Sequence, residues 1–219
     1  MSIGTIKREA KASLKNRWGL AILLTVVTYG VYTLLPIPFE IVASGGYENW
    51  INDESDSAAS WISTAFAIVF SPLLMANYWA FLGLARGESV QLGHLFKTFQ
   101  DFGLYVKSLG IYVLMTLYVM LWSLLLLIPG IIKALAYSQT YYICKDNPTY
   151  SMNQAITESR RLMDGYKGQY FLLLLSFLGW FLLSIFTFGI GFLWSIPYLS
   201  ASLARFYENL LNERSAHAE

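Results

Sequence analysis

The sequence predicts an all-α fold: an integral membrane helical bundle of six transmembrane helices arranged as three hairpins. Hydrophobic residues make up 56% of the 219 residues and charged residues only 13%, whereas soluble domains are about 25% charged. The apolar residues gather in runs that approach the length needed to cross a hydrocarbon core of about 30 Å. The basic residues gather between alternate runs, as they do in multi-pass membrane proteins.

The six predicted spans follow one another along a single membrane domain, residues 1–219. They run from Trp18 to Ile37, Trp61 to Ala85, Ser108 to Ile128, Ile131 to Cys144, Gln169 to Thr187 and Gly191 to Phe206. The fourth span covers only about 21 Å, so we expect it to continue as helix to Asn147, where Pro148 stops it. The predicted hairpins occupy residues 18–85, 108–147 and 169–206.

An amphipathic segment precedes each hairpin, at residues 1–17, 86–107 and 148–168, and residues 207–219 form a tail. The third segment gives the clearest helix, because Ser151 and Gln154 match a capping box and apolar residues recur at helical spacing from Met152 to Met163. Each descending helix also carries a proline, which we expect near its outer end, followed by two small residues four apart. The sets are Pro72 with Ala76 and Ala80, Pro129 with Ala134 and Ser138, and Pro197 with Ser200 and Ala204. The pattern predicts three repeats of amphipathic helix, ascending span and descending span.

The basic residues predict the orientation. Cytoplasmic loops are enriched in Lys and Arg. With the N-terminus inside, every basic residue except Lys133 falls on the cytoplasmic side, and the outer loop 43–60 contains only acidic charges. We therefore expect both termini and all three amphipathic segments in the cytoplasm.

The sequence contains no recognisable catalytic or metal-binding pattern. His94 and His217 have no second ligand at a suitable spacing, and Cys144 is a lone cysteine. A net charge of +1 gives no reason to expect nucleic acid as a partner. We expect no cofactor, no metal and no enzymatic activity.

Cationic side chains of the cytoplasmic layer are the candidate binding residues, because basic amphipathic helices attract anionic lipid headgroups. They are Lys7, Arg8, Lys11, Lys15, Arg160 and Arg161. At the opposite rim, Glu40 and Lys133 either form an ion pair or extend independently to the interface. The expected partners are the lipid bilayer, anionic lipids and another membrane protein.

Three stretches resemble the domain-of-unknown-function family 975. They are SLLLLIPGIIKALAYSQTYYICKDNP from Ser123, then AITESRRLMDGYKG, then LSFLGWFLLSIFTFGIGFLWSIPYLSASLARFYENL. The resemblance implies a bacterial plasma-membrane protein that crosses the membrane several times. It transfers no catalytic residues, because the family has none assigned.

Three functions follow as hypotheses. We favour a non-enzymatic protein that binds lipid or a membrane-protein partner. The alternative is a transporter or export component for a peptide or lipid substrate, which would need a separate ATPase because the chain has no nucleotide motif. An intramembrane enzyme is the third hypothesis, and Glu40, Lys133 and a group of tyrosines form no persuasive catalytic set for it.

Overall fold

The computed structural model describes residues 2–52 and 57–216, and every regular element in those ranges is a helix. Acidic residues 53–56 of the predicted outer loop lie outside the described residues. The helices, in chain order, are α1 (Ile3–Ser13), α2 (Trp18–Thr33), α3 (Ile37–Ala43), α4 (Tyr47–Ile51), α5 (Ser57–Val69), α6 (Ser71–Arg86), the 3-10 helix η1 (Leu92–Phe96), α7 (Lys97–Gln100), α8 (Phe102–Leu125), α9 (Leu127–Tyr137), α10 (Thr140–Asp146), α11 (Met152–Leu162), α12 (Lys167–Leu175), α13 (Leu178–Phe186) and α14 (Phe192–Ala216).

Three helical segments within the described ranges are long and apolar enough to cross a membrane: Trp18–Ala43, Phe102–Leu125 and Lys167–Phe186. A fourth candidate is the pair Trp61–Val69 and Ser71–Arg86, which is bent by 47°. The structure thus establishes an all-helical protein with three candidate membrane-spanning helices.

The fourth and sixth predicted spans are not among these candidates. The fourth is divided, since α9 ends at Tyr137 and α10 begins at Thr140. Ser159 of α11 stabilises this break, because its Oγ donates to Ala136 O at 2.8 Å and accepts from Gln139 N at 3.1 Å. The sixth forms the first part of α14, which continues into a charged C-terminal end.

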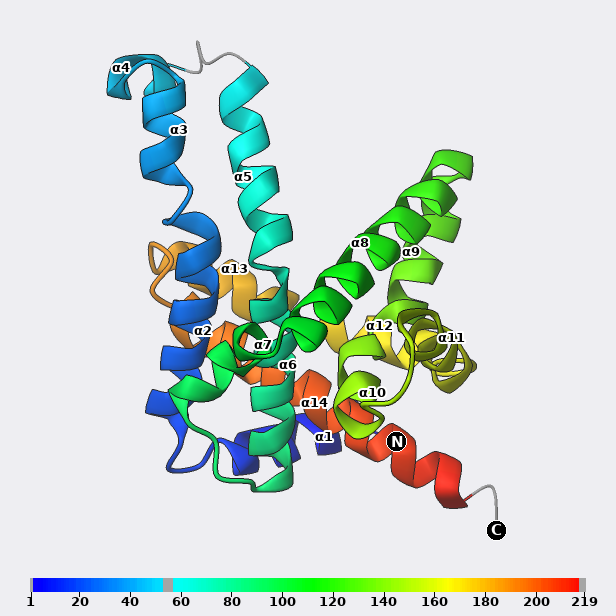
Figure 1. The fold of residues 1–219 in the computed structure, drawn as a ribbon. Helices are drawn as coiled ribbons and strands as arrows, with labels where there is room; N and C mark the ends of the chain where they lie inside the picture. Colours follow the sequence, from blue (N-terminus) through cyan, green and yellow to red (C-terminus); the bar gives the residue numbers. More distant parts are fainter. Residues whose placement is uncertain (1, 53–56, 217–219) are drawn as a thin grey trace.

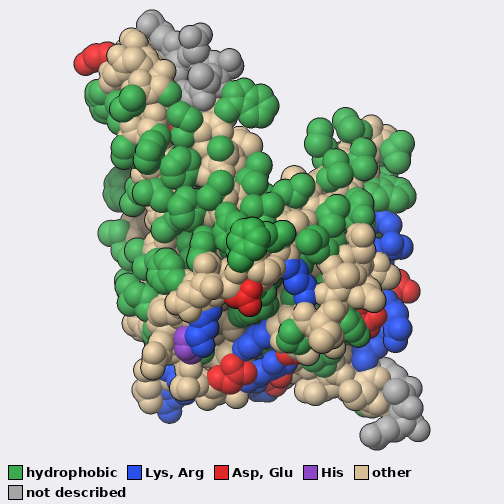
Figure 2. All heavy atoms as spheres, viewed as in Figure 1, with side chains coloured by type: hydrophobic (Ala, Val, Ile, Leu, Met, Phe, Trp, Pro, Cys, Tyr) green, Lys and Arg blue, Asp and Glu red, His purple; other side chains and the backbone are tan. Residues whose placement is uncertain are grey.

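Apolar and charged side chains occupy opposite ends of the molecule. The α3–α5 and α8–α9 hairpins project from a body that contains α1, α6, α10 and α14 (Figure 1). Figure 2 shows hydrophobic side chains over the projecting hairpins, whereas most Lys, Arg, Asp and Glu side chains gather over the body. This separation is the one expected of a protein with one end in lipid and the other in water.

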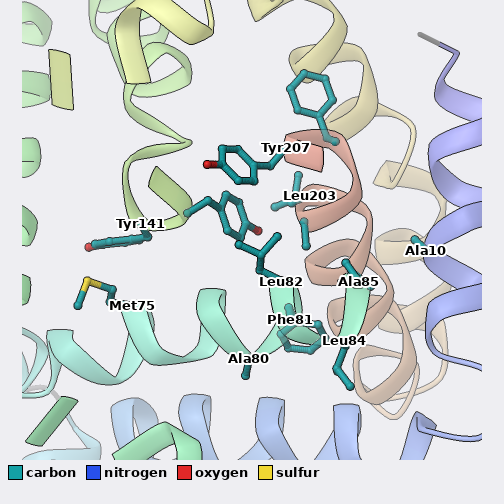
Figure 3. Close-up of a cluster of buried hydrophobic side chains, with 14 of the residues drawn as sticks. Ala10, Met75, Ala80, Phe81, Leu82, Leu84, Ala85, Tyr141, Leu203 and Tyr207 are labelled. Atoms are coloured by element: carbon teal, nitrogen blue, oxygen red, sulfur yellow. The ribbon is translucent and has the colours of Figure 1, made fainter. Parts of the chain in front are cut away.

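The core lies where the descending helices α6, α10 and α14 meet α1 and α2. Tyr142 of α10 stacks on Tyr207 of α14 with ring centroids 5.1 Å apart. Figure 3 shows Tyr207 in the same cluster as Phe81 of α6, which is fully buried. Ala76 and Ala80 of α6 are buried, so this predicted pair of small residues does lie at a helix interface.

Two features of the predicted repeat differ in the structure. Ala134, a predicted small contact residue, is exposed. Pro72, expected near the outer face, is buried beside α7, where its carbonyl accepts from Thr98 Oγ1 at 3.2 Å. The reason is that α7 folds back against the bend between α5 and α6.

An ion cluster joins α6, α10 and α14 at the charged end of the molecule. Arg86 of α6 binds Asp146 of α10 through two hydrogen bonds of 2.6 and 2.8 Å, and its Nε donates to Glu208 of α14 at 2.9 Å. Tyr207 Oη also donates to Asp146 at 2.8 Å. Burial alone would raise the pKa of Asp146, but the hydrogen bonds from Arg86 and Tyr207 outweigh burial and lower that pKa. We call these four residues the Arg86 cluster.

Replacing Arg86 with Ala will lower the free energy of unfolding by about 2 kcal/mol, because two partly buried carboxylates lose their charged donor. Unfolding in mixed micelles titrated with SDS measures the change. Asp146→Asn will cost a similar amount, and the double variant will be less destabilised than the sum of the two. Strict additivity of the two losses would show that the Arg86 cluster does not couple the helices.

Candidate functional site

The local sequence of α11 determines its ends and its buried face. Ser151 Oγ accepts from Gln154 N at 3.3 Å, and Gln154 Oε1 accepts from Ser151 N at 2.7 Å, which confirms the predicted capping box. Ala155, Ile156 and Ser159 are buried, as the helical spacing predicts. With this face packed against α8, α9 and α10, the basic residues at the end of α11 point away from the core.

A cationic pocket lies beside this end of α11, with a volume of about 420 Å³. Five of its lining residues are basic and one is acidic. The lining consists of Ile132, Lys133, Ala136, Thr157, Arg160, Arg161, Asp164, Lys167 and Arg214. The helices α9, α11, α12 and α14 therefore all contribute to one concentration of positive charge.

Some of these cations have a structural role. Arg214 donates to the carbonyl oxygens of Arg161, Leu162 and Asp164 at 2.9, 3.3 and 3.0 Å, so it caps the C-terminal end of α11. Lys167 lies 3.4 Å from the carboxylate of Asp164. These contacts join α14 to the end of α11, and the start of α12 to the loop that follows α11.

Other cations in the pocket are available to an anion. Arg160 is exposed and makes no ion pair among the described residues. Arg161 is exposed too, and Glu158 lies 3.9 Å from its Nε. Lys133 Nζ lies 4.3 Å from the ring centroid of Trp122, a cation–π contact that leaves its ammonium at the pocket wall. One carboxylate cannot balance this set, so the pocket favours an anionic ligand.

The N-terminal candidates separate into two groups. Arg8 and Lys11 of α1, with Lys15 from the turn that follows it, line a second basic pocket of about 490 Å³ beside Trp18. Lys7 points elsewhere: its Nζ donates to Ser176 O at 2.8 Å and lies 4.2 Å from the ring centroid of Phe177. Burial lowers the pKa of Lys7. Lys7 therefore holds α1 against the break between α12 and α13, and it is not free to contact a headgroup.

Of the two alternatives for Glu40 and Lys133, the structure favours independent side chains, because it places the two residues in different surroundings. Glu40 accepts hydrogen bonds from Ser63 and from Trp50 Nε1, the latter at 3.2 Å, in the α3–α5 hairpin. Lys133 instead lines the cationic pocket with Arg160. Sequence position alone suggested the outer face for Lys133, but α11 packs against α9 at the neighbouring Ala136.

A third concave surface is apolar. Tyrosines from the five helices α2, α6, α8, α9 and α10 line a groove of about 500 Å³; they are Tyr29, Tyr78, Tyr112, Tyr137 and Tyr141. In the described part of the chain, no group of three or more His, Cys, Asp or Glu residues could hold a metal ion. The chemistry available at these surfaces is therefore charge recognition and apolar contact.

The comparison with protein families concerns the same part of the chain as the cationic pocket. Residues 124–214 match the DUF975 family. Its model is described as a protein of unknown function. The match confirms the family resemblance for this segment, and every residue that lines the cationic pocket lies within the DUF975 segment. No curated protein and no solved structure matches the chain significantly.

Sequence reasoning found Arg160 and Arg161 but missed Lys167 and Arg214 as neighbours of the same site. Lys167 follows Gly165 at the start of a predicted span, and Arg214 lies in the tail. Both belong to the basic residues that the sequence predicts on the same side of the membrane as Arg160 and Arg161. The sequence does not predict that the four meet, because their meeting depends on how α14 lies at the end of α11.

Arg214→Gln will lower the free energy of unfolding by about 1–2 kcal/mol, because three carbonyl oxygens lose a charged donor. Arg160→Gln is the matched control and will change it by less than about 0.5 kcal/mol, since Arg160 is exposed and has no ion-pair partner among the described residues. SDS titration in mixed micelles compares the two variants. Equal losses would contradict this division of the pocket into structural and available cations.

Proposed function

We propose that this is a non-enzymatic, multi-pass protein of the bacterial plasma membrane that binds anionic lipid headgroups in its cationic pocket. The observation that carries the proposal is the convergence of five basic side chains and one carboxylate around about 420 Å³. Clusters of Lys and Arg at a membrane interface attract anionic headgroups at about 1 kcal/mol per residue. Arg160 and Arg161 supply planar guanidinium groups, which suit phosphate oxygens.

Apolar surface next to the pocket supports a lipid rather than a soluble anion. Ile132 lines the pocket and is exposed, and Ile131 beside it is exposed as well. A lipid can place its phosphate among the cations and its acyl chains along these side chains. A free phosphate would use only the first contact.

The proposed orientation places α1, α11 and the end of α14 in the cytoplasm. The charge asymmetry of the sequence motivates it, and the separation of charged and apolar side chains over the two ends of the molecule supports it. The three hairpins then enter the bilayer from the cytoplasmic side, each after its own amphipathic segment: α1, η1 with α7, and α11. This is the threefold repeat that the sequence predicts.

The tyrosine-lined groove is the observation that favours the alternative, a transport or export component. The groove lies among candidate spanning segments and accommodates an apolar chain of a peptide or lipid. Such a function would require a separate ATPase. Co-purification of an ATPase, with hydrolysis stimulated by a lipid or peptide, would distinguish this function from lipid binding alone.

Arg160→Gln will weaken binding of phosphatidylglycerol about fivefold, the equivalent of losing about 1 kcal/mol of charge attraction. Native mass spectrometry of the protein in detergent, titrated with phosphatidylglycerol or phosphatidylcholine, gives both affinities. Phosphatidylcholine, which has no net charge, will bind more weakly and will respond little to the substitution.

Lys97→Gln is the matched control, since it removes one exposed positive charge that does not line the cationic pocket. It will leave phosphatidylglycerol affinity within twofold of the parent. If Lys97→Gln and Arg160→Gln weaken binding equally, the protein attracts lipid through its overall charge and the pocket is not the site. Inorganic phosphate that competes as effectively as the lipid would point to a soluble anion.

Cysteine labelling in intact cells tests the orientation. Asn49→Cys in α4 will react with an impermeant maleimide from outside, whereas Ser215→Cys at the end of α14 will react only after the membrane is permeabilised. Cys144 is buried and contributes little background. External labelling of Ser215→Cys would overturn the proposed orientation.

A further inference from the structure

Only part of the α8–α9 hairpin projects from the body, because most of α8 packs against neighbouring segments. The helix α8 lies beside the body as far as Tyr118: Lys107 Nζ donates to Pro148 O at 2.6 Å, and Tyr118 Oη donates to Asn153 Oδ1 of α11 at 3.1 Å. On α9, Ala136 O accepts from Ser159 of α11. The amphipathic helix α11 thus crosses the hairpin at Tyr118 and Ala136.

Little helix remains beyond this crossing. We call residues 119–135 the hairpin tip. Tyr118 lies about 11 Å along α8 from its end at Leu125, and Lys133 lies about 9 Å along α9 from its start at Leu127, at 1.5 Å per residue. One leaflet of a bilayer has a hydrocarbon thickness of about 15 Å and the whole core about 30 Å. The hairpin tip therefore matches one leaflet and not two.

The side chains at the end of the hairpin tip are apolar and exposed. Leu124, Leu125, Leu127 and Ile128 are each 70–72% exposed. Lys133 marks the opposite limit of this apolar surface, because it lines the pocket that also contains Arg160, Lys167 and Arg214. The apolar side chains at the end of the hairpin tip are suited to contact acyl chains. The cations of the pocket are suited to contact anionic headgroups of the same leaflet.

At two positions of the turn, Leu126 and Pro129, no backbone N–H is left without a partner. A single residue, Leu126, joins the two helices, and its N–H donates to Trp122 O at 3.3 Å. Pro129 in the first turn of α9 has no N–H that would need a partner. Gly130 allows the helices to touch, since a Cβ there would lie 2.9 Å from Cβ of Ser123. Ser123 Oγ itself donates to Val119 O at 2.8 Å.

We propose that the α8–α9 hairpin inserts into the acyl chains of the cytoplasmic leaflet only and ends near the bilayer centre. It is a re-entrant hairpin and not a pair of transmembrane crossings. The segment Trp18–Ala43 differs, because its 26 residues cover about 39 Å and lead to the acidic loop. The proposal rests on the orientation given above but not on lipid binding in the cationic pocket.

A spin label at Ile128→Cys, in a Cys144→Ala background reconstituted into phosphatidylglycerol–phosphatidylcholine vesicles, measures the depth of the hairpin end. Near the bilayer centre the label will collide frequently with oxygen and rarely with the aqueous relaxant NiEDDA. A crossing hairpin would place the label at the outer headgroups, where collisions with NiEDDA dominate. That result, or a label in bulk water, would overturn the proposal.

Labelling in cells supplies a second measurement that does not need the reconstituted protein. Ile128→Cys will resist the impermeant maleimide both before and after permeabilisation, whereas Asn49→Cys will react before it. Leu124→Cys, on the other arm of the hairpin, will behave as Ile128→Cys does. Reaction of either from outside would show that the hairpin crosses. Reaction of Ser215→Cys from outside would instead overturn the orientation, so the two failures are distinguishable.

Discussion

The Arg86 cluster is the interaction on which the rest of the structure depends. Arg86 joins Asp146 and Glu208, so one guanidinium links the three descending helices α6, α10 and α14 at the charged end of the molecule. In a membrane protein the lipid chains are as apolar as the helix surfaces, so apolar contact alone does not select which helices pair. The contact of one guanidinium with carboxylates on two other helices is specific in geometry, so it does select the helices that pair.

The position of α11 follows from that arrangement. With α10 held against α14, Ser159 reaches the break between α9 and α10, and Arg214 reaches the carbonyl end of α11. These two contacts bring α9 and α14 to the basic end of α11. The cationic pocket is thus a consequence of helix packing. Arg160 and Arg161 remain available to a ligand because Arg214 donates the hydrogen bonds that cap the end of α11.

The DUF975 segment contains both the cationic pocket and the α8–α9 hairpin end from Leu124 onward. A single unit therefore combines a headgroup-sized cluster of cations with an apolar tip of about one leaflet in length. This combination is the basis for our proposal that the protein recognises the cytoplasmic leaflet from within it. In that proposal the basic pocket beside Trp18, which lies outside the segment, supplies a second contact for the same surface.

The sequence by itself determined the helical class, the apolar runs and the capping box and buried stripe of α11. These depend on neighbouring residues: hydropathy over a window, spacing along one helix, and a side chain that caps its own backbone. It also identified Arg160 and Arg161 as exposed cations, because they fall on the polar side of that stripe.

Only the tertiary structure decided which distant residues meet. Charge and position suggested an outer location for Lys133 and a free surface role for Lys7, but packing placed Lys133 beside Arg160 and directed Lys7 to the Ser176 carbonyl. The depth of the α8–α9 hairpin likewise depends on where α11 crosses it. Local sequence carries no information about such crossings, because they are determined by contacts between helices that are far apart in the chain.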